Sequence, residues 1–355
     1  MSQFLPNCLP LLIGSLPLEN HTEATELIFD YTPQIPLWPQ LPVYKEEGMI
    51  LQYVPGLPGL TKVNEKIYID TDSAAFEAEL LAFYEEYLMV TEGIAPIDES
   101  RFLLSPDVAK GFYTFLAEAE KKKESLIGLK GQTTGPITFC TGLVDQAGRA
   151  IFYNDQLRDA AVKHLAMKAR WQTKKMAEVG GQPIMFFDEP GLAGLGSSAF
   201  ITITSEDIIA CFSEVFEAVR AENGLTGVHV CANTEWPVLF DSGVDIVSYD
   251  AYSYFDKLIL YPDHLIKYFS RGGILATGIV PTAPEFIDIE TVDGLVEKWI
   301  EQTRQLQAIG IDAKTVYQQT LITPSCGTGT VSVDQATKVL ALTKGVSEKI
   351  RASFA

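Results

Sequence analysis

Short apolar runs alternate along the chain with longer stretches in which apolar residues recur at helical spacing. The short runs predict strands at residues 9–14, 126–129, 184–187, 227–230, 245–249, 273–279 and 315–320. The longer stretches predict helices at 73–89, 155–178, 204–223, 234–240, 262–269 and 291–308, with two more opening at 105 and 332. The chain therefore has the pattern of an α/β protein.

Strands separated by helices of this length predict right-handed βαβ units and a parallel sheet. We expect one (β/α)8 TIM barrel over residues 1–355, because the strand count is near eight. A doubly wound open sheet is less favoured, since no glycine-rich phosphate turn follows the first strand. The proline-rich stretch 31–59 predicts an ordered excursion, so an N-terminal extension at about 20–70 should cover part of the barrel.

Charge and cysteine content narrow the class of protein. The chain has 46 acidic and 27 basic residues and a net charge of −19, which argues against nucleic-acid partners and an anionic membrane surface. Residues 1–10 lack the basic start of a signal peptide, and no apolar run reaches the roughly 18 residues of a membrane span. Five scattered cysteines argue against a disulfide scaffold, so we expect a cytoplasmic protein.

Side chains capable of chemistry follow the predicted strands. They are Asp188 and Glu189, His229 and Cys231, Asp250, and Cys326. In a barrel the carboxyl ends of the strands converge on one face, where active sites lie. Residues distant in the sequence should therefore meet in one pocket.

His229 and Cys231 are two positions apart, so on a strand they point to the same face. Together with Cys326 and a carboxylate from Asp250, they would form a set that suits tetrahedral Zn²⁺. The plainer interpretation is core packing, which is the usual role of an isolated His-x-Cys in a strand. Cys326 argues for the metal, because it lies in a loop beside Pro324 and Gly327 that would not bury it.

These motifs together resemble the catalytic C-terminal barrel of cobalamin-independent methionine synthase. They also resemble the corrinoid-dependent zinc thiol methyltransferases, within the uroporphyrinogen-decarboxylase-like group. The resemblance is carried by Ile13-Gly14-Ser15, residues 134–138, Asp188-Glu189-Pro190, His229, Cys231 and Cys326.

The resemblance implies a role for each motif. Backbone groups of Ile13-Gly14-Ser15 would hold an amino-acid carboxylate, and Asp188, followed by Glu189, would bind the amine. His229, Cys231 and Cys326 would be zinc ligands. Asp250 stands where the family has a glutamate ligand, and the family's His-Gly-Glu segment has no clear counterpart before residue 73.

A centre with two thiolates and one carboxylate is a poor Lewis acid but activates a thiol. The expected function is therefore zinc-dependent methyl transfer from a methylated corrinoid to a thiol, with homocysteine the first candidate acceptor. The donor would be methylcobalamin or a corrinoid carrier protein. Folate is disfavoured, because the folate-dependent enzymes have an N-terminal half without a counterpart here and because this chain is acidic.

Three alternatives stay open. The acceptor could be coenzyme M, as in methylcobamide-dependent enzymes. A metal-free decarboxylase of the uroporphyrinogen type would need a cationic cleft, yet no arginine lies in the first hundred positions. A corrinoid- or metal-binding protein without turnover is the third. Binding without methyl transfer to any thiol would favour it.

Overall fold

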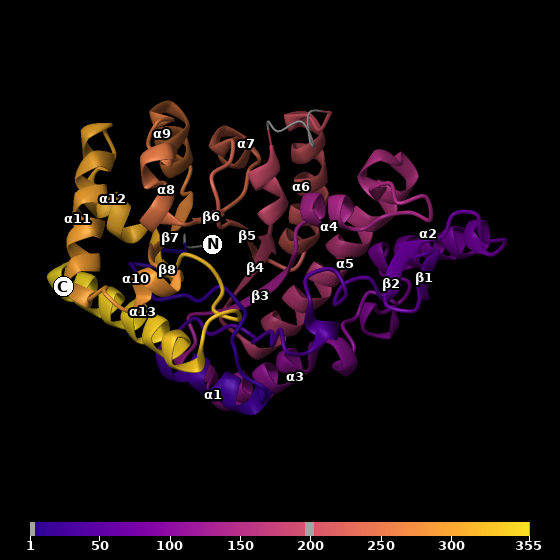
Figure 1. Ribbon diagram of the computed structural model, residues 1–355, viewed down its shortest axis with the longest axis horizontal. Helices are drawn as coiled ribbons and strands as arrows, with labels where there is room; N and C mark the ends of the chain where they lie inside the picture. The colour runs from indigo at the N-terminus through magenta and orange to yellow at the C-terminus, as the bar shows by residue number, and fades with distance from the viewer. Residues whose placement is uncertain (1–3, 196–201, 355) are drawn as a thin grey trace.

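The computed structural model describes residues 4–195 and 202–354. Its centre is a curled sheet of six parallel strands that follow one another in chain order, with helices packed on the outside (Figure 1). The strands are β3 Gly128–Thr134, β4 Gln182–Asp188, β5 Leu225–Val230, β6 Ile246–Tyr249, β7 Ile274–Val280 and β8 Thr320–Pro324. The chain is thus an α/β protein, as predicted, with a TIM-like arrangement.

The regular sheet has six strands rather than the eight of the expected complete barrel. The predicted strand at 9–14 forms only an isolated bridge to β8, in which the Leu11 N–H donates to the Ile322 carbonyl at 2.9 Å. A second extended segment, residues 34–40, runs along β3, where the Lys130 N–H donates to Pro36 at 2.9 Å. Pro10 and Pro36 lack the N–H that a regular ladder needs, so neither segment completes a strand.

The two extended segments also meet each other. The Leu16 N–H donates to the Gln40 carbonyl at 3.1 Å, and the Gln40 N–H donates to the Gly14 carbonyl at 3.2 Å. Both edges of the six-stranded sheet are therefore covered by hydrogen-bonded backbone.

The eight predicted helices lie close to their expected positions, and the described residues also form α-helices that were not predicted, at His21–Tyr31, Pro136–Gly142, Ala251–Leu258, Pro284–Ile287 and Ala313–Gln318. Within the sheet region they are α4 Pro136–Gly142, α5 Asp155–Val179, α6 Ser205–Arg220, α7 Trp236–Asp241, α8 Ala251–Leu258, α9 Pro262–Ser270, α10 Pro284–Ile287, α11 Val292–Ala308, α12 Ala313–Gln318 and α13 Val333–Phe354. Before the sheet come α1 His21–Tyr31, the hairpin β1 Leu60–Val63 and β2 Lys66–Ile69, α2 Phe76–Thr91 and α3 Pro106–Lys121. In Figure 1 the hairpin and α2 lie at one end of the molecule, far from α11 and α12.

The strand predicted at 315–320 is wrong. Asp312 caps α12 by accepting the Thr315 N–H at 3.0 Å, so the β-branched pair Thr315-Val316 enters a helix instead. The strand β8 begins only at Thr320. This shift brings Cys326 two residues beyond the strand end.

The core has an inner and an outer layer. The inner layer fills the curled sheet and consists of Leu9, Leu11, Ile35, Ile184, Phe186, Ile246, Ile274, Ala276 and Leu321. The outer layer lies between the sheet and the helices. Alternate residues of β4 point inward, so Asp188 follows Ile184 and Phe186 on the inner face at the carboxyl end.

The predicted extension begins with α1, which packs against α3 and α13. His21 of α1 and Glu47 form a buried hydrogen bond with 2.5 Å between His21 Nε2 and Glu47 Oε1, and the second Glu47 oxygen accepts the Leu41 N–H at 2.7 Å. The loop after the second extended segment is thus fixed to α1. Among the described residues, no helix combines the length and apolarity required to cross a membrane.

Candidate metal centre

Three neighbouring strands place polar side chains in one row at their carboxyl ends. Asp188 of β4 is paired with His229 of β5, and His229 is paired with Ser248 of β6. Residues paired in this way on parallel strands point to the same side of the sheet. All three therefore face the inside of the curled sheet, above its apolar filling.

His229 is oriented by its neighbour on the next strand. Its Nδ1 lies 2.9 Å from Ser248 Oγ, and the ring is only 4% exposed. Its Nε2 is buried and has no hydrogen-bond partner among the described residues. A buried ring nitrogen without a partner is costly, whereas a histidine whose other nitrogen is hydrogen-bonded is set up as a metal ligand.

Cys231 and Cys326 complete a cluster with His229. One ligand atom from each of these residues lies within 4.8 Å of the others, as in a site that could close around a metal ion. Cys231 follows β5, and Cys326 lies on the loop after β8. The structure thus brings together three of the four metal-ligating residues that the sequence predicts.

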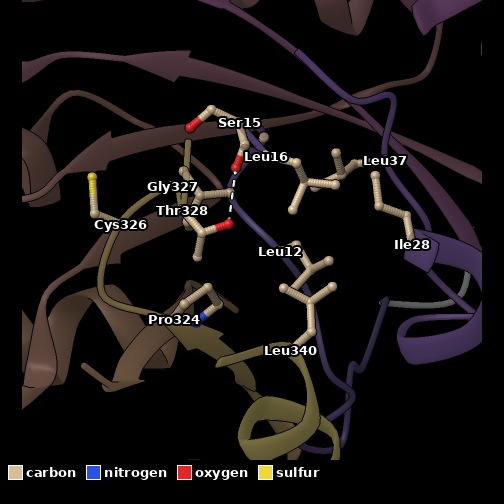
Figure 2. A pocket seen from close by; sticks show the side chains of 12 residues that line it. Leu12, Ser15, Leu16, Ile28, Leu37, Pro324, Cys326, Gly327, Thr328 and Leu340 are labelled. Atoms are coloured by element: carbon tan, nitrogen blue, oxygen red, sulfur yellow. Dashed lines mark hydrogen bonds between the residues drawn. The ribbon is translucent and has the colours of Figure 1, made fainter. Parts of the chain in front are cut away.

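The loop that carries Cys326 is held by the Gly14-Ser15 turn. Thr328 donates to the Ser15 carbonyl from its N–H at 3.0 Å and from its hydroxyl at 3.2 Å (Figure 2). A Cβ at Gly327 would lie 2.2 Å from Ser15 Oγ, so the loop and the turn are in close contact at this glycine. In Figure 2 the Cys326 sulfur points away from the leucines of the small cavity behind the turn. Cys326 is itself one of the residues that line this cavity.

The two thiols influence each other's protonation. The neighbouring Cys326 thiol and the His229 ring lower the pKa of Cys231. The nearby Cys231 and burial raise the pKa of Cys326. The pair therefore retains one proton at neutral pH, with Cys231 as the thiolate, and a thiolate is the form that binds metal.

Asp250 does not join the cluster of atoms within 4.8 Å of one another. It caps α8, and its Oδ1 accepts the Ser253 N–H at 2.9 Å. Burial raises the pKa of this carboxyl, and the nearby Cys231 raises it further. The expected fourth ligand is thus engaged at a helix end.

Asp188 is half-buried beside the cluster, and its Oδ1 is buried with no partner in the described part of the chain. Burial raises the pKa of Asp188, whereas Lys130 and His229 oppose that shift. An unpartnered buried carboxylate oxygen is costly unless a ligand completes it.

Glu189 is already committed to the fold. Its Oε1 accepts the Ile137 N–H at 2.9 Å, and its Oε2 accepts the N–H and hydroxyl of Thr138 at 2.7 and 2.6 Å. A Cβ at Gly135 would lie 2.3 Å from the Glu189 carboxyl carbon. Glycine at position 135 therefore lets the start of α4 pack directly against Glu189. The sequence predicted Glu189 as a substrate-binding residue, whereas in the structure its carboxylate binds the start of α4.

The Ile13-Gly14-Ser15 turn has its carbonyl groups occupied. Ile13 accepts from Lys130 Nζ at 2.5 Å, Gly14 accepts from Gln40 and Ser15 accepts from Thr328. Within the described chain, the N–H groups of Gly14 and Ser15 donate to no protein acceptor. Two backbone donors near Cys326 thus have no partner within the described chain.

Sequence reasoning missed two side chains of this region, Ser248 and Lys130. Ser248 is fully buried, although a serine within an apolar strand gives no local signal of its role. Lys130 is also fully buried, between Gly128 and Gly131 in a strand whose alternate positions point inward. The sequence feature that could have identified Lys130 is a lysine at an inward-pointing position of a predicted strand.

No protein-family profile matches the chain. No curated protein matches it either. Among solved structures, one of the pneumococcal virulence factor StrH, from work on N-glycan recognition and hydrolysis, has a TM-score of 0.46 at 11% identity, covering 96% of this chain and 83% of that one. A second, of the tandem catalytic modules of the pneumococcal exo-beta-D-N-acetylglucosaminidase StrH, has a TM-score of 0.43 at 10% identity, covering 96% and 85%. Similarity this low carries no argument about this chain's activity.

Proposed function

We propose that this protein is a zinc-dependent methyltransferase that moves a methyl group from a methylated corrinoid to a thiol, with homocysteine as the first candidate acceptor. The observation that carries the proposal is the meeting of His229, Cys231 and Cys326, whose ligand atoms lie within 4.8 Å of one another. It also accords with the resemblance to the catalytic barrel of cobalamin-independent methionine synthase.

The residues present suit a zinc ion. His229 offers an unpartnered Nε2, and Cys231 and Cys326 offer sulfur, which are the donor types that zinc prefers. When bound, zinc lowers the pKa of an incoming thiol and leaves its sulfur nucleophilic. With Asp250 outside the cluster, the fourth position is free for water or the substrate thiol.

An amino-acid thiol matches the groups around the cluster. The free oxygen of Asp188 accepts hydrogen bonds from an ammonium group, and the N–H groups of Gly14 and Ser15 donate to a carboxylate. Hydrogen-bonding partners for both charged groups of the amino acid favour homocysteine over coenzyme M, whose sulfonate carries no ammonium beside it.

The proposed methyl donor rests on the chemistry of the thiol acceptor and on the net charge of the chain. The thiolate sulfur supplies the electron pair of the new carbon–sulfur bond, while the pair of the carbon–cobalt bond stays with the corrinoid. The thiol proton leaves to solvent. A net charge of −19 disfavours a polyglutamated folate, so a corrinoid on a carrier protein is the proposed partner.

The proposal extends to the fold and the compartment. The extended segments 8–16 and 34–40 would serve as the first two strands of a (β/α)8 barrel, since they bridge β8, β3 and each other. All five cysteines are free, which accords with the reducing cytoplasm.

The test combines metal analysis with methyl transfer from free methylcobalamin. Purified protein should hold one zinc per chain, and loss of methylcobalamin absorption should require both zinc and homocysteine. Cys231→Ala should abolish both zinc retention and demethylation, whereas Cys211→Ala, at a buried cysteine of α6 outside the cluster, should abolish neither. Consumption of methyl-folate with methylcobalamin intact would refute the donor. Full zinc content in both Cys231→Ser and Cys326→Ser would refute the site.

A further inference from the structure

Gln40 places a side-chain carbonyl oxygen beside the Gly14-Ser15 turn. The side chain is half-buried, and its Oε1 accepts no hydrogen bond from the residues that the structure describes. A Cβ at Gly14 would lie 3.0 Å from this oxygen. With a Cα–Cβ bond of about 1.5 Å, Oε1 is therefore within about 4.5 Å of the Gly14 Cα.

Two neighbours fix which end of the Gln40 amide faces the turn. Its Nε2 donates to Gln52 Oε1 at 2.5 Å and to the Tyr53 hydroxyl at 3.2 Å. Gln52 donates its own Nε2 to the Val108 carbonyl at 2.6 Å. The Tyr53 hydroxyl donates to the Gln132 carbonyl at 3.0 Å. Because their donors are bound to backbone carbonyls, both neighbours present acceptors to Gln40, and the amide oxygen is held toward the turn.

Glycine at position 14 keeps the space in front of this oxygen open. Gly14 is not among the residues with a positive φ, so its backbone conformation does not call for glycine. A Cβ there would instead lie 3.0 Å from Gln40 Oε1 and 3.5 Å from the Gln132 side chain. The missing side chain therefore leaves room for a ligand group at the oxygen.

The turn lies between Gln40 and the loop that carries Cys326. Two backbone hydrogen bonds, at 3.1 and 3.2 Å, join residue 40 to the turn on one side. On the other side Thr328 donates its N–H to the Ser15 carbonyl (Figure 2). A free acceptor, two free N–H donors and the loop of a metal-ligand candidate thus meet at one turn. The turn is joined to residue 40 by backbone groups alone, so a different side chain at this position leaves it in place.

We propose that Gln40 is a specificity-determining residue whose Oε1 accepts a hydrogen bond from the ammonium group of an amino-acid thiol. In an α-amino acid the ammonium and the carboxylate are attached to one carbon, so the acceptor of the first must lie beside the donors to the second. Gln40 meets this requirement for a carboxylate held by Gly14 and Ser15. An ammonium group has three N–H donors, so this bond leaves two for other acceptors such as Asp188. The inference rests on the proposed function and assigns the specificity of that same site.

The experiment compares two thiols that differ only in the amine. Homocysteine and 4-mercaptobutanoate are titrated into cobalt-substituted protein, where thiolate binding is read from the visible absorption without any methyl donor. In Gln40→Met the affinity for homocysteine should fall about tenfold or more, because a hydrogen bond to a charged group is lost. The affinity for 4-mercaptobutanoate should change less than about twofold, because this thiol has no amine and the turn stays in place.

Gln40→Glu separates acceptance of the ammonium from a merely structural role. Methionine and glutamate both lose the N–H groups that donate to Gln52 and Tyr53, but only glutamate keeps an acceptor beside Gly14. The ratio of the homocysteine affinity to the 4-mercaptobutanoate affinity should therefore stay at least as high in Gln40→Glu as in the unaltered protein. A structural role would lower both affinities in both variants.

A second variant covers the oxygen without touching its side chain. Gly14→Ala places a methyl group 3.0 Å from Gln40 Oε1 and leaves the bonds to Gln52 and Tyr53 intact. The same affinity ratio should fall in this variant.

Gln182→Met is the matched control. Gln182 is also half-buried, and its Nε2 also donates to two acceptors, the Asn223 and Pro183 carbonyls at 2.8 and 3.2 Å. It lies at the amino end of β4, away from the cluster at the carboxyl ends, so this variant should leave the ratio unchanged.

The outcomes separate the inference from the proposed function. Equal losses for both thiols in Gln40→Met, an unchanged ratio in that variant, or a loss of selectivity in Gln40→Glu would overturn the role of Gln40. Failure of the unaltered protein to bind either thiol would instead refute the proposed function.

Discussion

Removing the Ser248 hydroxyl should weaken metal binding without touching a ligand. Ser248 Oγ lies 2.9 Å from His229 Nδ1, and the two side chains are 0% and 4% exposed. Water cannot replace the hydroxyl at such a buried position. In Ser248→Ala the metal-free ring can place its proton on Nε2, toward the cysteines. Metal binding then forces that proton onto an unpartnered Nδ1.

The penalty for an unsatisfied buried donor is about 1–3 kcal/mol. Loss of the partner behind a metal-bound histidine typically lowers metal affinity about 10–100-fold, which is roughly 1.4–2.8 kcal/mol. The two ranges agree, so we expect a zinc affinity about 10–100-fold lower in Ser248→Ala. Competition with a chromophoric zinc chelator measures the affinity directly.

Ser347→Ala is the matched control for this prediction. Ser347 is a fully buried serine of α13, and its hydroxyl donates to the Cys8 carbonyl at 2.7 Å. This variant loses a comparable hydrogen bond far from the cluster, so its zinc affinity should be unchanged. A folded Ser248→Ala protein that binds zinc within about twofold of the unaltered chain would refute the role of this bond.

Three further outcomes follow from the site. Gly135→Ala should lower the free energy of unfolding by about 1–3 kcal/mol, measured by urea denaturation, because the added Cβ would meet the Glu189 carboxyl group at 2.3 Å. In metal-free native protein, iodoacetamide should label Cys231 first, because the pKa of this thiol is lowered. Burial raises the pKa of Cys8 and Cys140 and should protect both thiols until the protein unfolds. Peptide mapping identifies which cysteine is labelled first. Zinc binding at pH 7 should release about one proton, the one shared by the two thiols. Calorimetry in buffers of different ionisation enthalpy should detect this proton release. The zinc affinity should also fall as the pH falls. Binding without proton release would contradict the shared proton.

The three metal-ligand candidates could be predicted because their signal is local. His229 and Cys231 share a face through the two-residue period of a strand, and Cys326 lies in a loop with no packing reason for a cysteine. The carboxyl ends of parallel strands converge, so the row of candidates predicts one site. The helices were also predictable, because caps and apolar periodicity are properties of short stretches.

The strand count shows where local patterns fail. Residues 34–40 complete an edge of the sheet through backbone carbonyls, yet their prolines read as a loop. The β-branched run at Thr315 reads as a strand, yet the Asp312 cap draws it into α12. In both cases a hydrogen bond to another part of the backbone outweighs the intrinsic preference of the residues.

Roles of the acidic residues were decided only in three dimensions. Asp188, Glu189 and Asp250 are equivalent in the sequence, as carboxylates that follow strands. In the structure Glu189 binds the start of α4, Asp250 caps α8, and Asp188 alone of the three has a buried oxygen without a partner.

The sequence by itself determined the α/β class, most of the helices and the residue types that could bind a metal. The tertiary structure alone decided which carboxylates are free, how Ser248 orients His229, and that Lys130 is buried with its Nζ bonded to the Ile13 carbonyl. The physical reason is that a donor or an acceptor becomes available only when no other group satisfies it. That competition is between strands and loops far apart in the chain, so it is settled only when they pack together.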